Sequence, residues 1–256
     1  MIDFADWLAL REPADAAARS TELVRRLRAR APLVIHDLGS GTGSMVRWLA
    51  PQLPGPQHWV LHDRDPALLR RAVASLPAGV TAETRGGDLT RLTAADLAGA
   101  SLVTASALLD MLTAEEVERI VGACAGAPAL LTLSVIGQVE LDPPDPLDAA
   151  LAAAFDDHQR RTVGGRTLLG PDAAATAAAA FRRRGRPVEV RDTPWRLGSG
   201  ALTEEWLTGW VGAACGQRIE LTGRATAYAA RRRDDMAAGR LGVVVGHADL
   251  LVPGIV

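Results

Sequence analysis

A short apolar stretch followed by a glycine-rich turn, at residues 33–44, limits the possible folds more than any other feature of this chain. The stretch from Leu33 to Leu38 is mostly apolar and carries one acid near its end, and glycine then stands at positions 39, 41 and 43. Apolar stretches of this length are typical of buried parallel strands. Glycine lets a backbone bend sharply past a ligand, and the amides of a helix expected over residues 44–50 would attract a carboxylate or phosphate. The pattern predicts an α/β protein whose first strand ends at a small-molecule site.

The spacing of these glycines separates two classes of cofactor. A dinucleotide site has the pattern Gly-x-Gly-x-x-Gly, whereas the third glycine here comes one position early. This spacing disfavours a nicotinamide oxidoreductase. The segment from Asp37 to Gly43 instead resembles motif I of the class I S-adenosylmethionine-dependent methyltransferases.

Two later segments extend the resemblance. A second expected strand, residues 58–63, ends at Asp63, twenty residues after Gly43, where a ribose diol needs a carboxylate acceptor. A helix with Pro66 in its first turn follows, as in the family's Asp-x-Ser-Pro pattern. After a third expected strand near residues 80–84, Asp88 stands where the family has an acid that accepts a hydrogen bond from the adenine amine. The resemblance covers residues 33–135 through four ordered motifs.

The resemblance implies a doubly wound, seven-stranded, mostly parallel α/β sheet of the Rossmann-like methyltransferase type. It implies a single domain over residues 1–256, with an N-terminal helical cover (1–31), a cofactor-binding half (32–135) and a substrate-side half (136–256). A helical lid over about 198–238 would lie between strands six and seven. The cofactor would be S-adenosylmethionine, and the product S-adenosylhomocysteine. The residues expected to bind this cofactor are Asp37, Gly39, Ser40, Gly41, Gly43, Asp63, Arg64, Asp88, Leu89, Ser106 and Arg19.

Composition agrees with an ordinary globular enzyme. The 256 residues are 48% hydrophobic and 23% charged, and the net charge of −2 gives no general attraction to nucleic acid. No apolar run is long enough to span a bilayer, and the first residues lack a basic region ahead of an apolar one, so we expect a cytoplasmic protein, a monomer or a homodimer. Cys124 and Cys215 are isolated, which indicates neither a zinc site nor a disulfide framework.

The segment from Asp6 to Arg30 has a helical pattern and resembles the N-terminal helices that cover the cofactor in many small-molecule methyltransferases. Arg11, Asp15 and Arg19 lie four apart and therefore share one helix face. The favoured interpretation is a surface ladder of ion pairs. The alternative is that Arg19 reaches the methionine carboxylate of the cofactor.

Three residues are candidates for the base that takes a proton from the acceptor. Asp110 lies in the loop between a fourth strand, residues 101–105, and a helix begun by the capping box Thr113-Ala114-Glu115-Glu116. Ligands bind at this end of the strands in open α/β sheets, although a short acid can also merely hold its loop. His158 and His247 are the next candidates, and a buried structural role is the usual one for a histidine such as His247.

The second half departs from a plain member of the fold. Strand five is expected over residues 129–135, helices over 147–161 and from 171 to about 184, strand six at 188–190 and strand seven over 241–246. About forty-five residues intervene between the last two strands, and this insertion holds Trp195, Trp206 and Trp210. Aromatic pairs four apart on a helix are more often core than pocket, but a lid here could hold an apolar or planar acceptor.

The expected function is methyl transfer from S-adenosylmethionine to an oxygen or nitrogen of a small molecule. One alternative is an RNA or tRNA methyltransferase, which the arginine runs at 182–184 and 231–233 could suggest, although each run stands at an expected helix end. Another is a non-catalytic protein that binds S-adenosylmethionine. No Asn-Pro-Pro-Tyr motif and no catechol-type metal triad is recognisable, so the acceptor atom stays open and no metal is expected.

Overall fold

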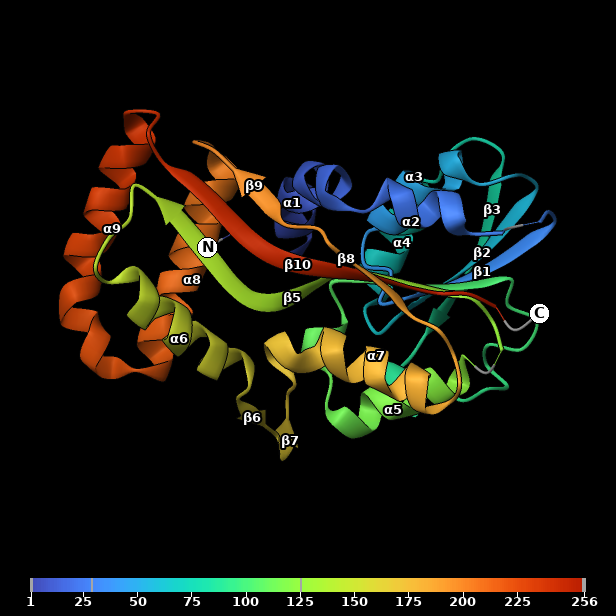
Figure 1. Ribbon diagram of the computed structural model, residues 1–256. Helices are drawn as coiled ribbons and strands as arrows, with labels where there is room; N and C mark the ends of the chain where they lie inside the picture. The colour runs from blue at the N-terminus through green and yellow to red at the C-terminus, as the bar shows by residue number, and fades with distance from the viewer. Residues whose placement is uncertain (1, 29, 125, 255–256) are drawn as a thin grey trace.

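A computed structural model describes residues 2–28, 30–124 and 126–254. Its centre is a sheet in the order β3-β2-β1-β4-β5-β10-β8, in which the first five strands are parallel (Figure 1). This is the doubly wound order, because the chain begins in the middle and moves outward in both directions. The parallel strands are β3 (Val80–Gly86), β2 (Gln57–Asp63), β1 (Leu33–Leu38), β4 (Leu102–Ser106) and β5 (Ala129–Asp142).

Helices cover both faces of the parallel strands. One face packs against α2 (Thr21–Arg26), α3 (Ser44–Leu49) and α4 (Pro66–Ala74), and the other against α5 (Ala114–Ala123) and α7 (Ala173–Arg183). Local sequence sets the helix ends: the Thr113 side chain accepts from the Glu116 amide while the Glu116 carboxylate accepts from the Thr113 amide, so the expected capping box is confirmed. Short 3-10 segments join these elements at Ala50–Gln52, Leu89–Arg91, Leu109–Met111, Gly170–Asp172 and Ile219–Leu221.

Beyond the parallel strands, the sheet continues into an arm that projects from the layered body (Figure 1). The arm consists of the distal parts of β5 and the antiparallel β10 (Gly242–Val252), together with β9 (Trp195–Leu197) and three helices. These helices are α6 (Asp148–Gln159), α8 (Ala201–Gln217) and α9 (Thr222–Ala237). The arm has its own apolar core, which includes Trp206, Trp210 and Tyr228.

The strands of the second half differ from the expectation in length and number. β5 runs seven residues past Val135 because these residues pair with the first part of β10 along the arm. β10 runs six residues past Gly246 because these residues pair with residues 129–135 of β5 and with β8. The expected strand six is two short strands, β8 (Glu189–Asp192) and β9, which pair with different parts of β10. Among the described residues the main sheet therefore has eight strands where seven were expected.

The remaining elements flank the parallel strands and the arm. The predicted N-terminal helix is present as two segments, α1 (Phe4–Ala18) and α2. Helix α1 contacts β9 and α8. Position 29, within the predicted segment, lies outside the described residues. The hairpin β6–β7 (Thr162–Val163 and Arg166–Thr167) follows α6. No described helix has both the length and the apolar character that crossing a membrane requires.

Candidate functional site

The glycine turn between β1 and α3 is crowded on three sides. Gly39, Gly41 and Gly43 have φ angles of +67°, +53° and +85°, which side chains other than glycine rarely adopt. A Cβ at each position would also lie close to a neighbouring element. The nearest atoms belong to Leu108, Leu8 and Ala72, at 3.1, 3.2 and 3.1 Å respectively. The backbone of this turn is therefore held between α1, α4 and the loop after β4.

Asp63, at the end of β2, shapes the same turn. One of its carboxylate oxygens accepts from the Gly41 amide at 2.9 Å, and the other accepts from the Asp65 amide at 2.9 Å. Each oxygen keeps a free lone pair, and the side chain is partly exposed. The residue predicted to bind the ribose diol thus also holds the glycine turn against β2.

Asp37 is buried at the end of β1 with only half of its carboxylate satisfied. The Thr104 hydroxyl donates to one oxygen at 2.7 Å, while Oδ2 has no hydrogen-bond partner among the described residues. Burial raises the pKa of this carboxyl to about 7, with the Thr104 hydrogen bond and Arg19 acting in the opposite direction. An unpartnered buried carboxylate oxygen is costly, which indicates that a donor belongs there.

Arg19 is a buried cation with hydrogen-bond donors that lack an acceptor in the described part of the chain. Only 3% exposed, at the junction of α1 and α2, it donates from Nη2 to the hydroxyls of Ser44 and Ser106 at 3.0 and 2.9 Å. Its Nε and Nη1 have no partner among the described residues, and burial lowers the pKa of the guanidinium. The expected surface ladder is wrong at this position. Arg11 and Asp15 do form an i,i+4 ion pair. Arg19 instead is buried in the protein and interacts electrostatically with Asp37.

The remaining predicted cofactor residues lie at the same edge of the sheet. Register pairs Asp63 with Gly86, so Asp88 follows directly beyond the end of β3, where its carboxylate caps the Leu89–Arg91 segment by accepting from Thr90. Asp88 and Arg64 are exposed, Leu89 is half-buried, and Ser40 is buried with a hydroxyl that has no partner in the described part of the chain.

Asp110 lies at the carboxyl end of β4, in the segment Leu109–Met111. It is partly buried. Burial raises the pKa of this carboxyl, while a hydrogen bond from its own backbone amide and then the guanidinium groups of Arg11 and Arg161 lower it. A carboxyl group of this kind can accept a proton, and its bond to a backbone amide also fits the alternative that it holds its loop.

The two candidate histidines are each affected by one of the arginines that act on Asp110. His158, on α6, is partly buried; burial first, and then Arg161, lowers its pKa. His247, on β10, is 2% exposed; burial, and then Arg11, lowers its pKa to about 4. Its Nδ1 lies 2.9 Å from the Val245 carbonyl oxygen and so carries the proton, which leaves Nε2 as the basic nitrogen. Arg161 thus acts on both Asp110 and His158, and Arg11 acts on both Asp110 and His247.

The structure separates the three tryptophans. Trp195 donates from Nε1 to Asp15 at 3.0 Å, and the centroid of its ring lies 4.9 Å from the Arg11 guanidinium and 5.1 Å from the centroid of the His247 ring. Trp206 and Trp210 instead stack on each other, with ring centroids 5.2 Å apart, inside the core of the arm. These two were candidates for contact with the acceptor, although such pairs are more often core, and their burial in the arm gives them a core position.

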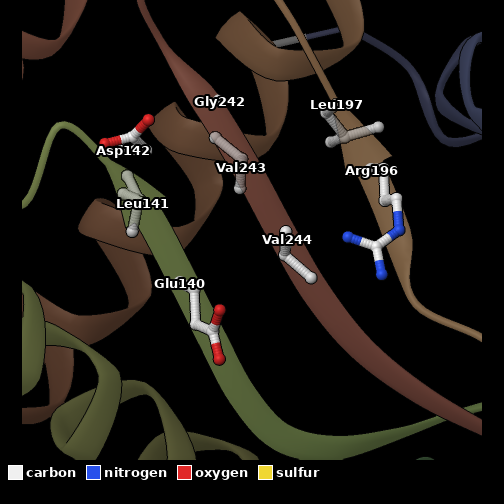
Figure 2. A pocket seen from close by; sticks show the side chains of 8 residues that line it. All are labelled: Glu140, Leu141, Asp142, Arg196, Leu197, Gly242, Val243 and Val244. Atoms are coloured by element: carbon white, nitrogen blue, oxygen red, sulfur yellow. The ribbon is translucent and has the colours of Figure 1, made fainter.

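A hollow on the arm does not coincide with these residues. A depression of about 270 Å³ lies on the open face of the arm strands, and Figure 2 shows Glu140 and Arg196 on opposite sides of Val244. None of the predicted site residues lines it. A second depression, of about 310 Å³, lies between α8 and α9. The placement of buried, unpartnered polar atoms locates the candidate site better than these hollows do, because a ligand must satisfy those atoms.

Sequence reasoning missed three participants. Thr104 and Arg161 carry no motif, and they matter only through their neighbours in space. Asp249, within the apolar residues 248–252, is fully buried and accepts from the amides of Ser20 and Leu133. A single acid inside an otherwise apolar strand was a signal that could have identified it.

Comparison with known proteins agrees with this geometry. Residues 35–127 match the family model described as a methyltransferase domain. Two solved structures share the fold. An O-methyltransferase family protein from Burkholderia thailandensis has 18% identity and a TM-score of 0.51, over 95% of this chain and 58% of its own. A cyclopropane-fatty-acyl-phospholipid synthase-like protein from Lactobacillus casei has 14% identity and a TM-score of 0.53, over 95% of this chain and 91% of its own.

No curated protein matches the chain. The chain spans less than two thirds of the Burkholderia thailandensis structure. Residues 35–127 match the methyltransferase-domain model, and the sheet order of the whole chain agrees with the class I methyltransferase fold.

Proposed function

We propose that this chain transfers the methyl group of S-adenosylmethionine to an oxygen or nitrogen atom of a small molecule. The observation that supports the cofactor site most directly is a pair of buried charged side chains, Asp37 and Arg19, whose hydrogen bonds are incomplete within the described chain. Oδ2 of Asp37 lacks a donor, and Nε and Nη1 of Arg19 lack an acceptor, among the described residues. The methionine part of the cofactor offers an ammonium and a carboxylate, which would complete both groups.

The other cofactor residues follow from their positions. The free lone pairs of Asp63 suit the ribose hydroxyls, and Asp88 and Leu89 lie at the neighbouring strand end, where the adenine would lie. The three glycines allow the left-handed backbone of the turn and its close packing against Leu108, Leu8 and Ala72.

The bound cofactor would supply an activated methyl group on a sulfonium. An acceptor hydroxyl or ammonium would have to lose its proton to a base of the chain. Asp110 is our first choice for that proton, since it lies at the carboxyl end of β4 and burial raises its pKa, followed by His158 and His247. Holding the reacting atoms close and aligned can lower the barrier by about 7 to 11 kcal/mol, so positioning is the main task of the chain.

The arginine runs support a small acceptor over RNA. Arg183 and Arg184 pair with Glu118, and Arg231, Arg232 and Arg233 pair with Asp145, Asp148 and Glu204. Arginines neutralised in this way have little charge left for phosphates. We propose that the arm covers the acceptor side, with Trp195 as its contact with the site.

Calorimetric titration with S-adenosylmethionine and S-adenosylhomocysteine, with NADH as the control ligand, tests the cofactor. We expect micromolar binding of the first two only, and at least tenfold weaker binding by Arg19→Gln. Release of S-adenosylhomocysteine on addition of small hydroxylated or amino compounds then tests turnover. Binding without any turnover would favour the non-catalytic alternative, and preference for NADH would overturn the proposal.

A further inference from the structure

Arg161 is a partly buried arginine that no carboxylate of the described chain pairs with. It directly follows α6, and its Nη1 donates only to the His158 carbonyl oxygen, at 2.9 Å. The adjacent Arg160 shows the contrast, since it makes a two-pronged pair with Asp172 at 2.6 and 3.0 Å. A guanidinium has five N–H donors, so Arg161 keeps most of its donors for another partner.

The hairpin β6–β7 fixes Arg161 next to the loop that carries Asp110. The Leu168 amide donates to the Arg161 carbonyl oxygen at 3.2 Å, and the Leu169 amide donates to the Leu112 carbonyl oxygen at 2.8 Å. Arg166, in the same hairpin, donates to the Met111 carbonyl oxygen at 3.1 Å and forms a two-pronged pair with Glu116 at 2.8 and 2.6 Å. These bonds tie residue 161 and residues 110–112 into one unit.

Charge interactions agree with this placement. Arg161 acts on both Asp110 and His158, two of the three candidate bases, and Arg11, the other arginine beside Asp110, is already paired with Asp15. The acceptor side thus repeats the arrangement of the cofactor side, where Arg19 lies beside Asp37. One free guanidinium matches one carboxylate in a planar two-pronged geometry, whereas a phosphate dianion would meet repulsion from Asp110.

We infer that the acceptor is a carboxylic acid, whose carboxylate binds Arg161 while its hydroxyl or amino group faces Asp110. This inference rests on the proposed function and specifies its substrate class. Arg161 is a specificity-determining residue in this arrangement, since it holds the acid end of the acceptor and places the nucleophile at the base. A neutral analogue of the same shape loses this contact.

The test uses the full chain saturated with S-adenosylhomocysteine and titrated with sodium benzoate, with benzamide as the uncharged probe of the same shape. Wild type is expected to bind benzoate at least tenfold more tightly than Arg161→Gln does, with Arg161→Lys between them. Benzamide is expected to bind all three proteins equally weakly. The matched control is Arg119→Gln, because Arg119 also bonds only to a backbone carbonyl, that of Thr90, but is exposed on α5. It should bind benzoate as wild type does.

The outcomes separate this inference from the proposed function. Equal benzoate affinity in wild type and Arg161→Gln, or no preference of wild type for benzoate over benzamide, overturns the role of Arg161 and leaves the methyltransferase proposal standing. Failure of wild type to bind S-adenosylhomocysteine at all overturns the proposed function instead. Circular dichroism checks the fold of each variant, and if Arg161→Gln does not fold, the comparison of wild type with Arg161→Lys decides.

Discussion

Asp37 and Arg19 are buried side chains of opposite charge that do not complete each other. Each has hydrogen-bonding atoms without a partner among the described residues, and each is held by hydroxyl groups, Thr104 for Asp37 and Ser44 and Ser106 for Arg19. Leaving such groups unsatisfied costs stability, since a buried donor or acceptor has lost its water. We interpret this cost as the requirement of a site that must bind a zwitterion.

Cofactor binding should therefore release a proton from Asp37. In the free protein the pKa of this carboxyl is about 7, and a bound ammonium would lower it, so the complex holds fewer protons near neutrality. Affinity for S-adenosylmethionine is then expected to rise as the pH is raised from 6 to 7.5. Calorimetry at pH 6.5 in two buffers with different ionisation enthalpies measures the release. Asp37→Asn should show none, and its absence in wild type would contradict this role.

Asp63→Ala should weaken cofactor binding by about 1.5 to 3 kcal/mol, the usual contribution of hydrogen bonds to a charged group. Part of this loss comes through Gly41, whose amide Asp63 holds. Asp65→Ala is the matched control, because Asp65 only caps α4 by accepting from the Ala67 amide at 2.7 Å. The control should lose about 1 kcal/mol of stability and no cofactor affinity. Equal affinities of Asp63→Ala and wild type would remove Asp63 from the site.

At the scale of elements, the arm is built as a small three-strand and three-helix unit on the ends of β5 and β10. Its core residues come from α6, α8, α9 and the arm strands, and helix α1 adds Trp7 to it. Gly137 lies where β5 enters the arm, with φ +71°, and a Cβ there would lie 2.7 Å from Asp156 Oδ2. The bend of β5 and the close packing of α6 therefore both require glycine at this position.

Trp206→Ala should lower the free energy of unfolding by about 3 to 5 kcal/mol, because a large ring leaves the core of the arm. The ring is 8% exposed and stacks on Trp210. Denaturant unfolding measures the loss, and calorimetry should show cofactor affinity within twofold of wild type. A variant that unfolds like wild type but binds its acceptor poorly would instead place Trp206 in the pocket.

β1 and β2 are joined by a buried histidine pair that makes the fold sensitive to acid. Nδ1 of His36 and Nε2 of His62 lie 3.0 Å apart, burial lowers both pKa values, and that of His62 falls to about 4. The unfolded chain therefore binds more protons than the folded one between about pH 6.5 and 4, so stability falls as the pH falls through this window. The charged side chains acting on the pair are Arg85, Glu83 and Asp96, besides His58.

The expected loss for wild type from this pair is up to about 3 kcal/mol between pH 6.5 and 4. Asp37 titrates in the same window, but its raised pKa makes its contribution to stability increase as the pH falls. Wild type and the variant both keep Asp37, so its contribution cancels when the two are compared. His62→Gln should therefore lose less stability than wild type over this range. Urea unfolding at pH 7, 6 and 5 gives the comparison, and parallel profiles would show that the pair has no part in acid sensitivity.

At the scale of the whole molecule, Asp249 joins segments far apart in the chain. Its carboxylate accepts from the Ser20 amide at 2.8 Å, the Leu133 amide at 2.8 Å and the Thr193 hydroxyl at 2.9 Å. Leu133 has φ +56°, beside a register shift between β5 and β10, so the carboxylate replaces a missing backbone partner there. The N-terminal helices, the sheet and the link between β8 and β9 thus meet at one side chain.

Asp249→Ala should lower the free energy of unfolding by about 3 kcal/mol and also weaken cofactor binding, because Arg19 directly precedes the anchored Ser20. Thermal unfolding and calorimetry with S-adenosylhomocysteine measure the two effects. Asp249→Asn keeps an acceptor oxygen and should lose less of both. A large loss of stability with unchanged cofactor affinity would show that Arg19 is positioned without Asp249.

The predictions that succeeded depend on neighbours in sequence. The order of the first five strands and the capping box at Thr113 follow from short patterns, and so does the position of Asp63 at a strand end. The predictions that failed depend on distant partners. Strand five was expected to end at Val135 because its later residues are mixed in polarity, yet pairing with β10 keeps them extended to Asp142.

The sequence by itself determined the class of the fold and the placement of the glycine turn and the strand-end acids at one edge of the sheet, because a parallel strand, a glycine turn and a strand-end acid are local features that must occur in order. Only the tertiary structure decided which charges are buried. Arg19 looked like one rung of a surface ladder, and Arg161 had no distinguishing pattern, until packing placed one beside Asp37 and the other beside Asp110. Burial and the satisfaction of polar groups depend on every element that surrounds a side chain, and no local pattern contains that information.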